Sequence, residues 1–162
     1  MAMRVLLVED EYLIRLWLAD CLREAGFDVT EAENGDRALA LLDIAGGFDL
    51  LITDLHMPGR ADGNAVAAGA KLRYPGLPVI YATGRCDSLR NKLAACDALV
   101  AKPYTSTTML TTAQRLLDTG RGPGNGGGPV DGIGWPQPGL EAEAATDART
   151  LRRGDRETAR AT

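Results

Sequence analysis

The chain has 162 residues, 45% of them hydrophobic, and a formal net charge of −4. This length allows one ordinary domain with an extension, and the negative charge excludes a basic surface for nucleic acid. No apolar run is long enough to cross a membrane, no signal-peptide pattern opens the chain, and the three cysteines lack metal-binding spacing. We therefore expect a cytoplasmic protein with reduced cysteines that binds neither DNA nor a membrane.

Short apolar runs alternate with segments of helical periodicity through residues 1–118, which we expect to fold as one domain. The pattern predicts strands at 4–8, 28–31, 50–53, 78–82 and 98–101. It predicts helices at 11–25, 35–45, 63–74, 87–94 and 107–118. Such strand–helix alternation is typical of a doubly wound α/β fold, in which helices cover both faces of a parallel sheet.

Residues 119–162 differ in composition from the rest of the chain. Their first half is rich in glycine and proline, and their second half mixes charged residues with alanine and threonine. They show no hydrophobic periodicity, so we predict a flexible C-terminal tail. Trp135 is the aromatic residue of this segment, and it is either incidental or part of a short docking motif for a partner.

Polar residues stand at the ends of four predicted strands. Glu9 and Asp10 follow the first strand, Asp54 follows the third, Thr83 follows the fourth and Lys102 follows the fifth. In an open parallel sheet, ligands bind beyond the carboxyl ends of the strands. We therefore expect these side chains to meet at one edge of the sheet.

Asp54 is the candidate nucleophile of this set, in a reaction that transfers a phosphoryl group to its carboxylate. Phosphoryl transfer depends mainly on positioning and on neutralising negative charge, so such a site needs a cation and a metal more than a strong base. Lys102 can pair with the phosphoryl group as a point charge. The Thr83 hydroxyl can donate a hydrogen bond to one of its oxygens.

A magnesium ion is the cofactor that this chemistry implies. Mg²⁺ prefers a few carboxylates together with water and phosphate oxygens. We expect Asp10, with Glu9 beside it, to hold the ion together with Asp54, and the backbone carbonyl of His56 can complete the shell. His56 is the only histidine of the chain, and we expect its side chain to be exposed in a loop.

The strand-end residues lie within four short motifs, which are Glu9-Asp10, D-x-x-M-P-G from Asp54, Thr83, and Lys102-Pro103. In this order, the motifs resemble the receiver domain of bacterial two-component response regulators, over about residues 3–118. The resemblance implies a flavodoxin-like (βα)5 fold with a five-stranded sheet in the order 2-1-3-4-5. It also implies that a histidine kinase or a histidine phosphotransfer protein passes a phosphoryl group to Asp54, and that the Lys102–Pro103 peptide bond is cis.

The segment YATG at residues 81–84 is similar to the signature of the stand-alone FATGUY receivers. That subclass generally lacks an attached output domain. The resemblance therefore implies a single-domain response regulator that signals through protein–protein interaction or onward phosphotransfer. Leu99 departs from the family, because most receivers have Tyr or Phe three residues before the lysine of the K-P motif. In those receivers the aromatic ring acts as a switch, because it changes position as the hydroxyl residue engages the phosphoryl group. Tyr81 or Tyr104 is an alternative for this aromatic switch.

Three other functions compete with a signalling receiver that is a phosphoacceptor and not an enzyme. An aspartyl-nucleophile phosphatase would place a second acid two residues after the nucleophile, where this chain has His56. A pseudo-receiver would act as an interaction module without phosphorylation, and the complete set of motifs argues against it. A transcription factor that binds DNA through residues 119–162 is disfavoured by the glycine-rich composition of that segment.

Overall fold

The computed structural model describes residues 1–44, 46–84 and 93–120 of the chain. The helix predicted at 87–94 lies outside the described residues except for its last two positions, which are not helical. The predicted tail lies outside them from residue 121 onward. Within the described part of the chain, no helix is long and apolar enough to cross a bilayer.

Five parallel strands form one sheet in the order β2-β1-β3-β4-β5. The strands are β1 (Arg4–Val8), β2 (Asp28–Ala32), β3 (Leu50–Asp54), β4 (Val79–Thr83) and β5 (Asp97–Ala101). The predicted strand order and fold class are therefore confirmed, and each strand begins and ends within one residue of its prediction. The main difference is that β3 and β4 include Asp54 and Thr83 as their last residues.

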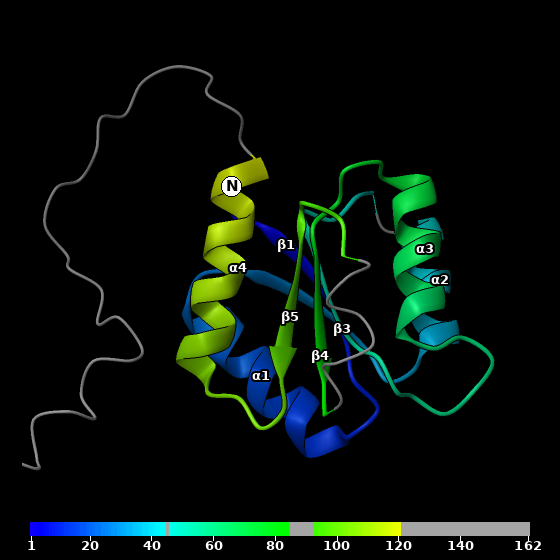
Figure 1. Ribbon diagram of the computed structural model, residues 1–162, viewed down its shortest axis with the longest axis horizontal. Helices are drawn as coiled ribbons and strands as arrows, with labels where there is room; N and C mark the ends of the chain where they lie inside the picture. The colour runs from blue at the N-terminus through cyan, green and yellow to red at the C-terminus, as the bar shows by residue number, and fades with distance from the viewer. Residues whose placement is uncertain (45, 85–92, 121–162) are drawn as a thin grey trace, which may run out of the picture. The chain divides into compact units, whose positions relative to one another are not determined.

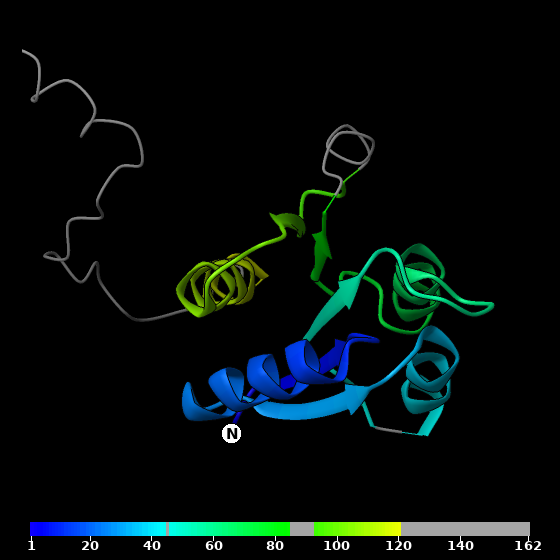
Figure 2. The same cartoon turned by 90° about the horizontal axis from the view of Figure 1, so that it is seen from below.

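Four described helices cover the two faces of the sheet. They are α1 (Tyr12–Glu24), α2 (Gly35–Ile44), α3 (Gly63–Arg73) and α4 (Ser106–Gly120). Helices α1 and α4 lie on one face and α2 and α3 on the other, as the two views at right angles show (Figures 1 and 2). This arrangement is the doubly wound architecture that the strand–helix alternation predicts.

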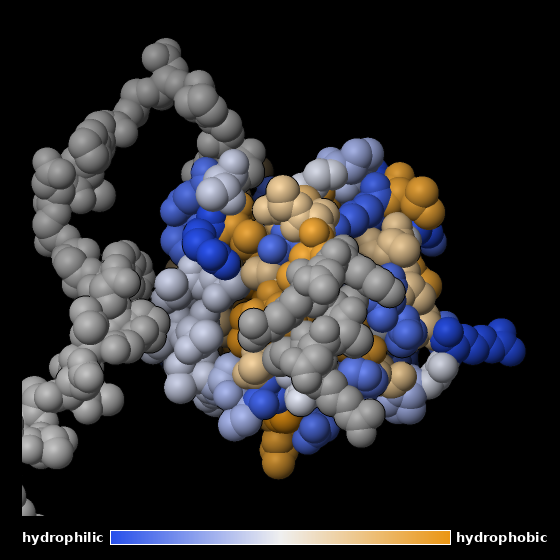
Figure 3. Space-filling view, viewed as in Figure 1, coloured by the Kyte–Doolittle hydropathy of each residue, from blue (hydrophilic) through white to orange (hydrophobic). Residues whose placement is uncertain are grey.

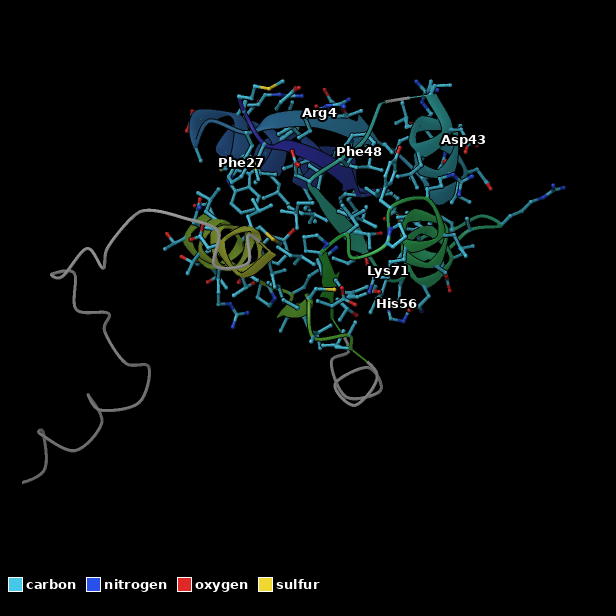
Figure 4. All side chains as sticks on the ribbon, turned by 90° about the horizontal axis from the view of Figure 1, so that it is seen from above. Arg4, Phe27, Asp43, Phe48, His56 and Lys71 are labelled. Carbon is cyan, nitrogen blue, oxygen red and sulfur yellow. The ribbon has the colours of Figure 1, made fainter. Side chains whose placement is uncertain are left out.

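The hydrophobic core forms two layers because both faces of the sheet are covered. Successive residues of a strand point to opposite faces, so Leu6 and Val8 of β1 join the core under α2 and α3, whereas Val5 and Leu7 join the core under α1 and α4. Strands β3 and β4 are buried along their whole length. Side chains fill both spaces between the sheet and the helices (Figure 4).

The carboxyl ends of all five strands lie at the same edge of the sheet, which is the lower edge in Figure 1. Helix α1 also begins at this edge, because it follows directly from the end of β1. Every strand-end residue singled out from the sequence is therefore delivered to one region of the molecule.

Candidate functional site

Three carboxylates meet at the carboxyl edge of the sheet. Glu9 and Asp10 follow β1, and Asp54 ends β3. Their side chains each offer one oxygen, and these oxygens lie within 4.8 Å of one another. Glu9 is only 2% exposed and Asp54 only 8% exposed. Like charges held this close, with two of them shielded from water, require a compensating cation.

Lys102 supplies one positive charge to this cluster. Its ammonium group donates hydrogen bonds to Oδ2 of Asp54 at 2.6 Å and to Oε2 of Glu9 at 2.9 Å. Burial alone would lower the pKa of Lys102, but the hydrogen bonds to Asp54 and Glu9 and their charges outweigh it and raise the pKa above its ordinary value. The lysine therefore stays charged at physiological pH.

The positive charge of one lysine does not neutralise the negative charge of the three carboxylates. Burial raises the pKa of Glu9 above its ordinary value even though Lys102 acts to lower it, and the charge of Asp54 raises it further. With three carboxylates and one ammonium group, the ionised cluster carries two negative charges in excess. A compact set of carboxylate oxygens with excess charge fits a hard divalent cation such as Mg²⁺. The predicted ligands Glu9, Asp10 and Asp54 are thus brought together.

The backbone around Asp54 holds its carboxylate in place. Its Oδ1 atom accepts a hydrogen bond of 2.9 Å from the backbone N–H of His56, while Oδ2 accepts the bond from Lys102. The Thr53 hydroxyl donates to the Asp54 carbonyl at 2.9 Å. Both carboxylate oxygens therefore have fixed directions before any ligand arrives.

Thr83 and His56 form a contact beside this cluster. The Thr83 side chain is fully buried, and its Oγ1 lies 3.3 Å from Nδ1 of His56. The His56 side chain is exposed, as expected from the sequence, and it lies on the α3 side of the sheet (Figure 4). From the sequence, only the backbone carbonyl of His56 was expected at the site, and its metal-binding role stays a prediction. The contact between its ring and Thr83 was missed.

Two helix-starting glycines were also missed. A Cβ atom on Gly63 would lie 2.1 Å from the Asp54 carbonyl oxygen, and one on Gly35 would lie 2.0 Å from the Ala61 carbonyl oxygen. These distances are too short for any side chain, so only glycine lets α2 and α3 begin against the loop that follows Asp54. The sequence signal was Asp62 before Gly63, since Asp62 caps α3 by accepting a hydrogen bond from a backbone N–H.

Large hydrophobic side chains are exposed on the first half of α1, next to the acidic cluster. They are Tyr12, Leu13, Leu16 and Trp17, which we call the α1 patch. Hydrophobic atoms protrude at the lower edge of the molecule in Figure 3, in the region where Figure 1 draws α1. An exposed apolar group of this kind is typical of an interaction surface.

The α1 patch is linked to the loop after Lys102 by an aromatic pair. The rings of Trp17 and Tyr104 have centroids 6.1 Å apart. Burial raises the pKa of Tyr104 to about 12, and its buried hydroxyl has no hydrogen-bond partner among the described residues. Leu99, which stands where most receivers have an aromatic, pairs with Tyr81 across β4 and β5. The switch role of either tyrosine stays a prediction.

The peptide bond between Lys102 and Pro103 is cis, as the resemblance implied. The Lys102 backbone N–H donates to the Thr83 carbonyl at 2.9 Å, which ties the end of β4 to the start of this turn.

Comparison with known proteins identifies the family. Residues 5–114 match the family described as Response regulator receiver domain. Chemotaxis protein CheY from Pseudomonas aeruginosa is 32% identical over 123 residues, which cover 72% of this chain and 97% of that protein. The crystal structure of a response regulator receiver protein from Sinorhizobium medicae matches with a TM-score of 0.69 at 28% identity, covering 74% of this chain and 97% of that chain. Response regulator protein TrrA from Thermotoga maritima, crystallised in complex with Mg²⁺–BeF, matches with a TM-score of 0.61 at 31% identity, covering 70% of this chain and 98% of that chain.

Other relatives are much longer than the matched segment. The match spans 24% of the response regulator protein FleR from Pseudomonas aeruginosa and 12% of the sensor kinase CckA from Brucella abortus. The family match, the sheet order and the acidic cluster with its lysine agree with one another. The chain therefore belongs to the response regulator receiver domain family, whose members are phosphoacceptor modules of two-component signalling and not enzymes of the usual kind.

Proposed function

We propose that Asp54 accepts a phosphoryl group from the phosphohistidine of a histidine kinase or a histidine phosphotransfer protein, in a reaction that depends on Mg²⁺. The observation that carries this proposal is the position of the Lys102 ammonium group, which contacts Asp54 at 2.6 Å and Glu9 at 2.9 Å at the edge where the strands end. The chain then signals by binding another protein or by passing the phosphoryl group onward.

The reaction is a direct exchange of one bond for another. A carboxylate oxygen of Asp54 attacks phosphorus, an O–P bond forms, and the N–P bond of the donor imidazole breaks. The electron pair of that bond returns to the donor nitrogen, which takes a proton. Lys102 neutralises the charge that gathers on the phosphoryl oxygens, and the Thr83 hydroxyl can donate to one of them.

Glu9, Asp10 and Asp54 are the residues proposed to hold Mg²⁺, together with the backbone carbonyl of His56. When bound, the ion neutralises charge on the phosphoryl oxygens and on the carboxylates around them. The donor set supports this assignment, because its oxygens lie within 4.8 Å of one another and one lysine leaves them with excess negative charge.

The phosphodonor is proposed to dock on the α1 patch. The donor must bring its imidazole to Asp54, and α1 begins at Tyr12, two residues after Asp10. Trp17 is 42% exposed on this helix. An apolar surface beside the acceptor carboxylate lets hydrophobic contacts provide affinity while the charged cluster stays open to the phosphoryl group.

Similarity to the FATGUY subclass at residues 81–84 supports, as a further proposal, a receiver that acts without an attached output domain. Under this proposal residues 1–118 suffice for phosphoryl acceptance and residues 119–162 do not contribute to it. A chain that ends at Asp118 should then accept phosphate as fast as the full chain, and a slower rate would assign the extension a part in the reaction.

Intact-mass measurement tests the proposed function. The chain is incubated with candidate histidine kinases or with acetyl phosphate, with and without Mg²⁺. We expect the mass of one phosphoryl group with Mg²⁺ and none after the substitution Asp54→Asn. Asp49→Asn is the matched control, because Asp49 lies just before the same strand at the opposite edge of the sheet. Phosphorylation that survives Asp54→Asn, or that does not need Mg²⁺, would contradict the proposal.

A further inference from the structure

The contact between His56 and Thr83 is not explained by the proposed reaction. Thr83 ends β4, and His56 lies 27 residues earlier in the loop after β3. Nδ1 of His56 lies 3.3 Å from Oγ1 of Thr83, which is the hydroxyl that the phosphoryl group is expected to use. A buried hydroxyl requires a hydrogen-bond partner inside the protein, and the imidazole provides one before any phosphoryl group is present.

The imidazole and the phosphoryl group compete for one proton. A threonine hydroxyl carries a single hydrogen and can donate it to one acceptor at full strength. If Nδ1 accepts that hydrogen, the imidazole is the tautomer protonated on Nε2. A phosphoryl oxygen on Asp54 would need the same hydrogen, so its arrival would end the donation from Thr83 to Nδ1.

His56 contacts both reacting parts of the site. Its backbone N–H donates to Oδ1 of Asp54 at 2.9 Å, and its ring reaches Thr83. The ring itself is exposed, so it can move away from Thr83 without disturbing the core. The position of the His56 ring therefore depends on whether the Thr83 hydroxyl donates a hydrogen bond to it.

We propose that the side chain of His56 is a positioning residue that acts through Thr83. In the unphosphorylated chain, Nδ1 of the ring accepts a hydrogen bond from the Thr83 hydroxyl. When Asp54 is phosphorylated, the hydroxyl donates to a phosphoryl oxygen instead. The His56 ring thereby stabilises the unphosphorylated state and weakens the hold of the site on a phosphoryl group. This inference rests on the proposed role of Asp54 as phosphoacceptor.

A double-mutant cycle tests whether His56 acts through Thr83. The measured quantity is the apparent affinity of the Mg²⁺-loaded chain for beryllofluoride, a phosphoryl mimic, followed in amide NMR spectra. His56→Ala should tighten binding about 3- to 10-fold, as expected for loss of one competing hydrogen bond. In the Thr83→Ala background the same substitution should have almost no effect. Equal effects in both backgrounds would overturn the inference.

His56→Asn is the matched control for this cycle. The asparagine side chain can place an amide oxygen near the position of Nδ1, so this variant should bind beryllofluoride within about twofold of the unmodified chain. A merely structural role of the ring would give no such rescue. An affinity for His56→Asn equal to that of His56→Ala would count against the proposed contact.

A second measurement does not depend on phosphorylation. Because the chain has one histidine, the long-range nitrogen spectrum of a tag-free sample shows a single imidazole. At pH 8 we expect the signal of an unprotonated, hydrogen-bonded Nδ1, and we expect it to shift in Thr83→Ala. Ring signals that are identical in the two chains would overturn the inference.

The two proposals fail in different ways. If Asp54 accepts phosphate but the cycle is additive, the inference about His56 is wrong and the proposed function stands. If Asp54 takes neither phosphate nor beryllofluoride, the proposed function is wrong, and the inference falls with it even where the ring spectrum shows the contact with Thr83.

Discussion

Two lysine–carboxylate contacts stand at opposite edges of the same sheet. At the amino edge, Lys71 of α3 pairs with Asp97, the first residue of β5. At the carboxyl edge, Lys102 pairs with Asp54 and Glu9. The carboxylates are similarly shielded, because the side chains of Asp97 and Glu9 are each 2% exposed. They differ in how their charge is compensated.

The contact at the amino edge is balanced. Asp97 receives one lysine and also accepts hydrogen bonds from the backbone N–H groups of Val79 at 3.2 Å and Ala94 at 3.4 Å. These bonds tie the start of β5 to the start of β4. The cluster at the carboxyl edge has three carboxylates for one lysine. The amino-edge pair, whose charges cancel, stabilises the fold. The carboxyl-edge cluster keeps an excess negative charge that a cationic ligand can neutralise.

Removal of each lysine should separate the two roles most strongly. Lys102→Met should slow phosphoryl acceptance at least about 100-fold, because it deletes a positive charge placed where transition-state charge develops. Lys71→Met should leave the rate within about twofold. The rates come from intact-mass time courses with acetyl phosphate and Mg²⁺. A comparable loss in both variants would mean that the amino-edge pair also supports the chemistry.

Removal of each carboxylate should change stability in different directions. Asp97→Ala should lower the free energy of unfolding by about 2–3 kcal/mol, because it leaves Lys71 and two backbone N–H groups without their acceptor. Asp54→Ala should leave it unchanged or raise it by up to about 1 kcal/mol, because it removes a like charge beside Glu9. Urea unfolding in Mg²⁺-free buffer measures both. An equal loss of unfolding free energy in both variants would show that the charges of the carboxyl-edge cluster are also compensated.

The pH dependence of stability should reveal the smallest effect. The pKa of Glu9 in the folded chain is raised above 4.5, mainly by burial, so the folded chain binds this proton more tightly than the unfolded chain. Ionisation of Glu9 therefore removes stability as pH rises from about 4.5 through the folded-state pKa.

Glu9→Gln is the variant that isolates this effect. It should be about as stable as the unmodified chain at low pH and more stable at pH 7, when both are unfolded by urea without Mg²⁺. Glu24→Gln, at an exposed position on α1, is the control and should show no such trend. If Glu9→Gln instead becomes less stable than the unmodified chain as pH rises, ionised Glu9 stabilises the folded chain and the expected effect is contradicted.

Most of the fold follows from local patterns in the sequence. Apolar runs of strand length alternate with helical periodicity, and strands that are apolar along their whole length, such as β3 and β4, are typical of parallel sheets with both faces covered. The site was predictable for the same reason, because carboxyl ends of parallel strands meet at one edge. Even so, Asp54 and Thr83 are the last residues of their strands and not the first residues of loops. Ladder hydrogen bonds to neighbouring strands extend the strands by one residue, and such bonds have no local signal.

The contacts that the strand-end residues make with residues of other segments were not predictable. The ring of His56 meets Thr83 because β3 and β4 are neighbours in register, with Asp54 opposite Ala82. The close approach of Gly63 to the Asp54 backbone depends on the angle at which α3 leaves its loop. Each contact depends on separations of a few tenths of an ångström between distant segments, which no residue pattern encodes.

The sequence by itself determined the strand–helix alternation and the set of residues expected to meet at the carboxyl edge, because hydrophobic periodicity and strand-end chemistry are local properties. The strand order followed only from the resemblance of the motifs to the receiver family. Only the tertiary structure decided that Lys102 contacts both Glu9 and Asp54, that Lys71 contacts Asp97, and that the cluster at one edge is left with excess charge. Charge balance is a property of distances between segments far apart in the chain, and folding sets those distances.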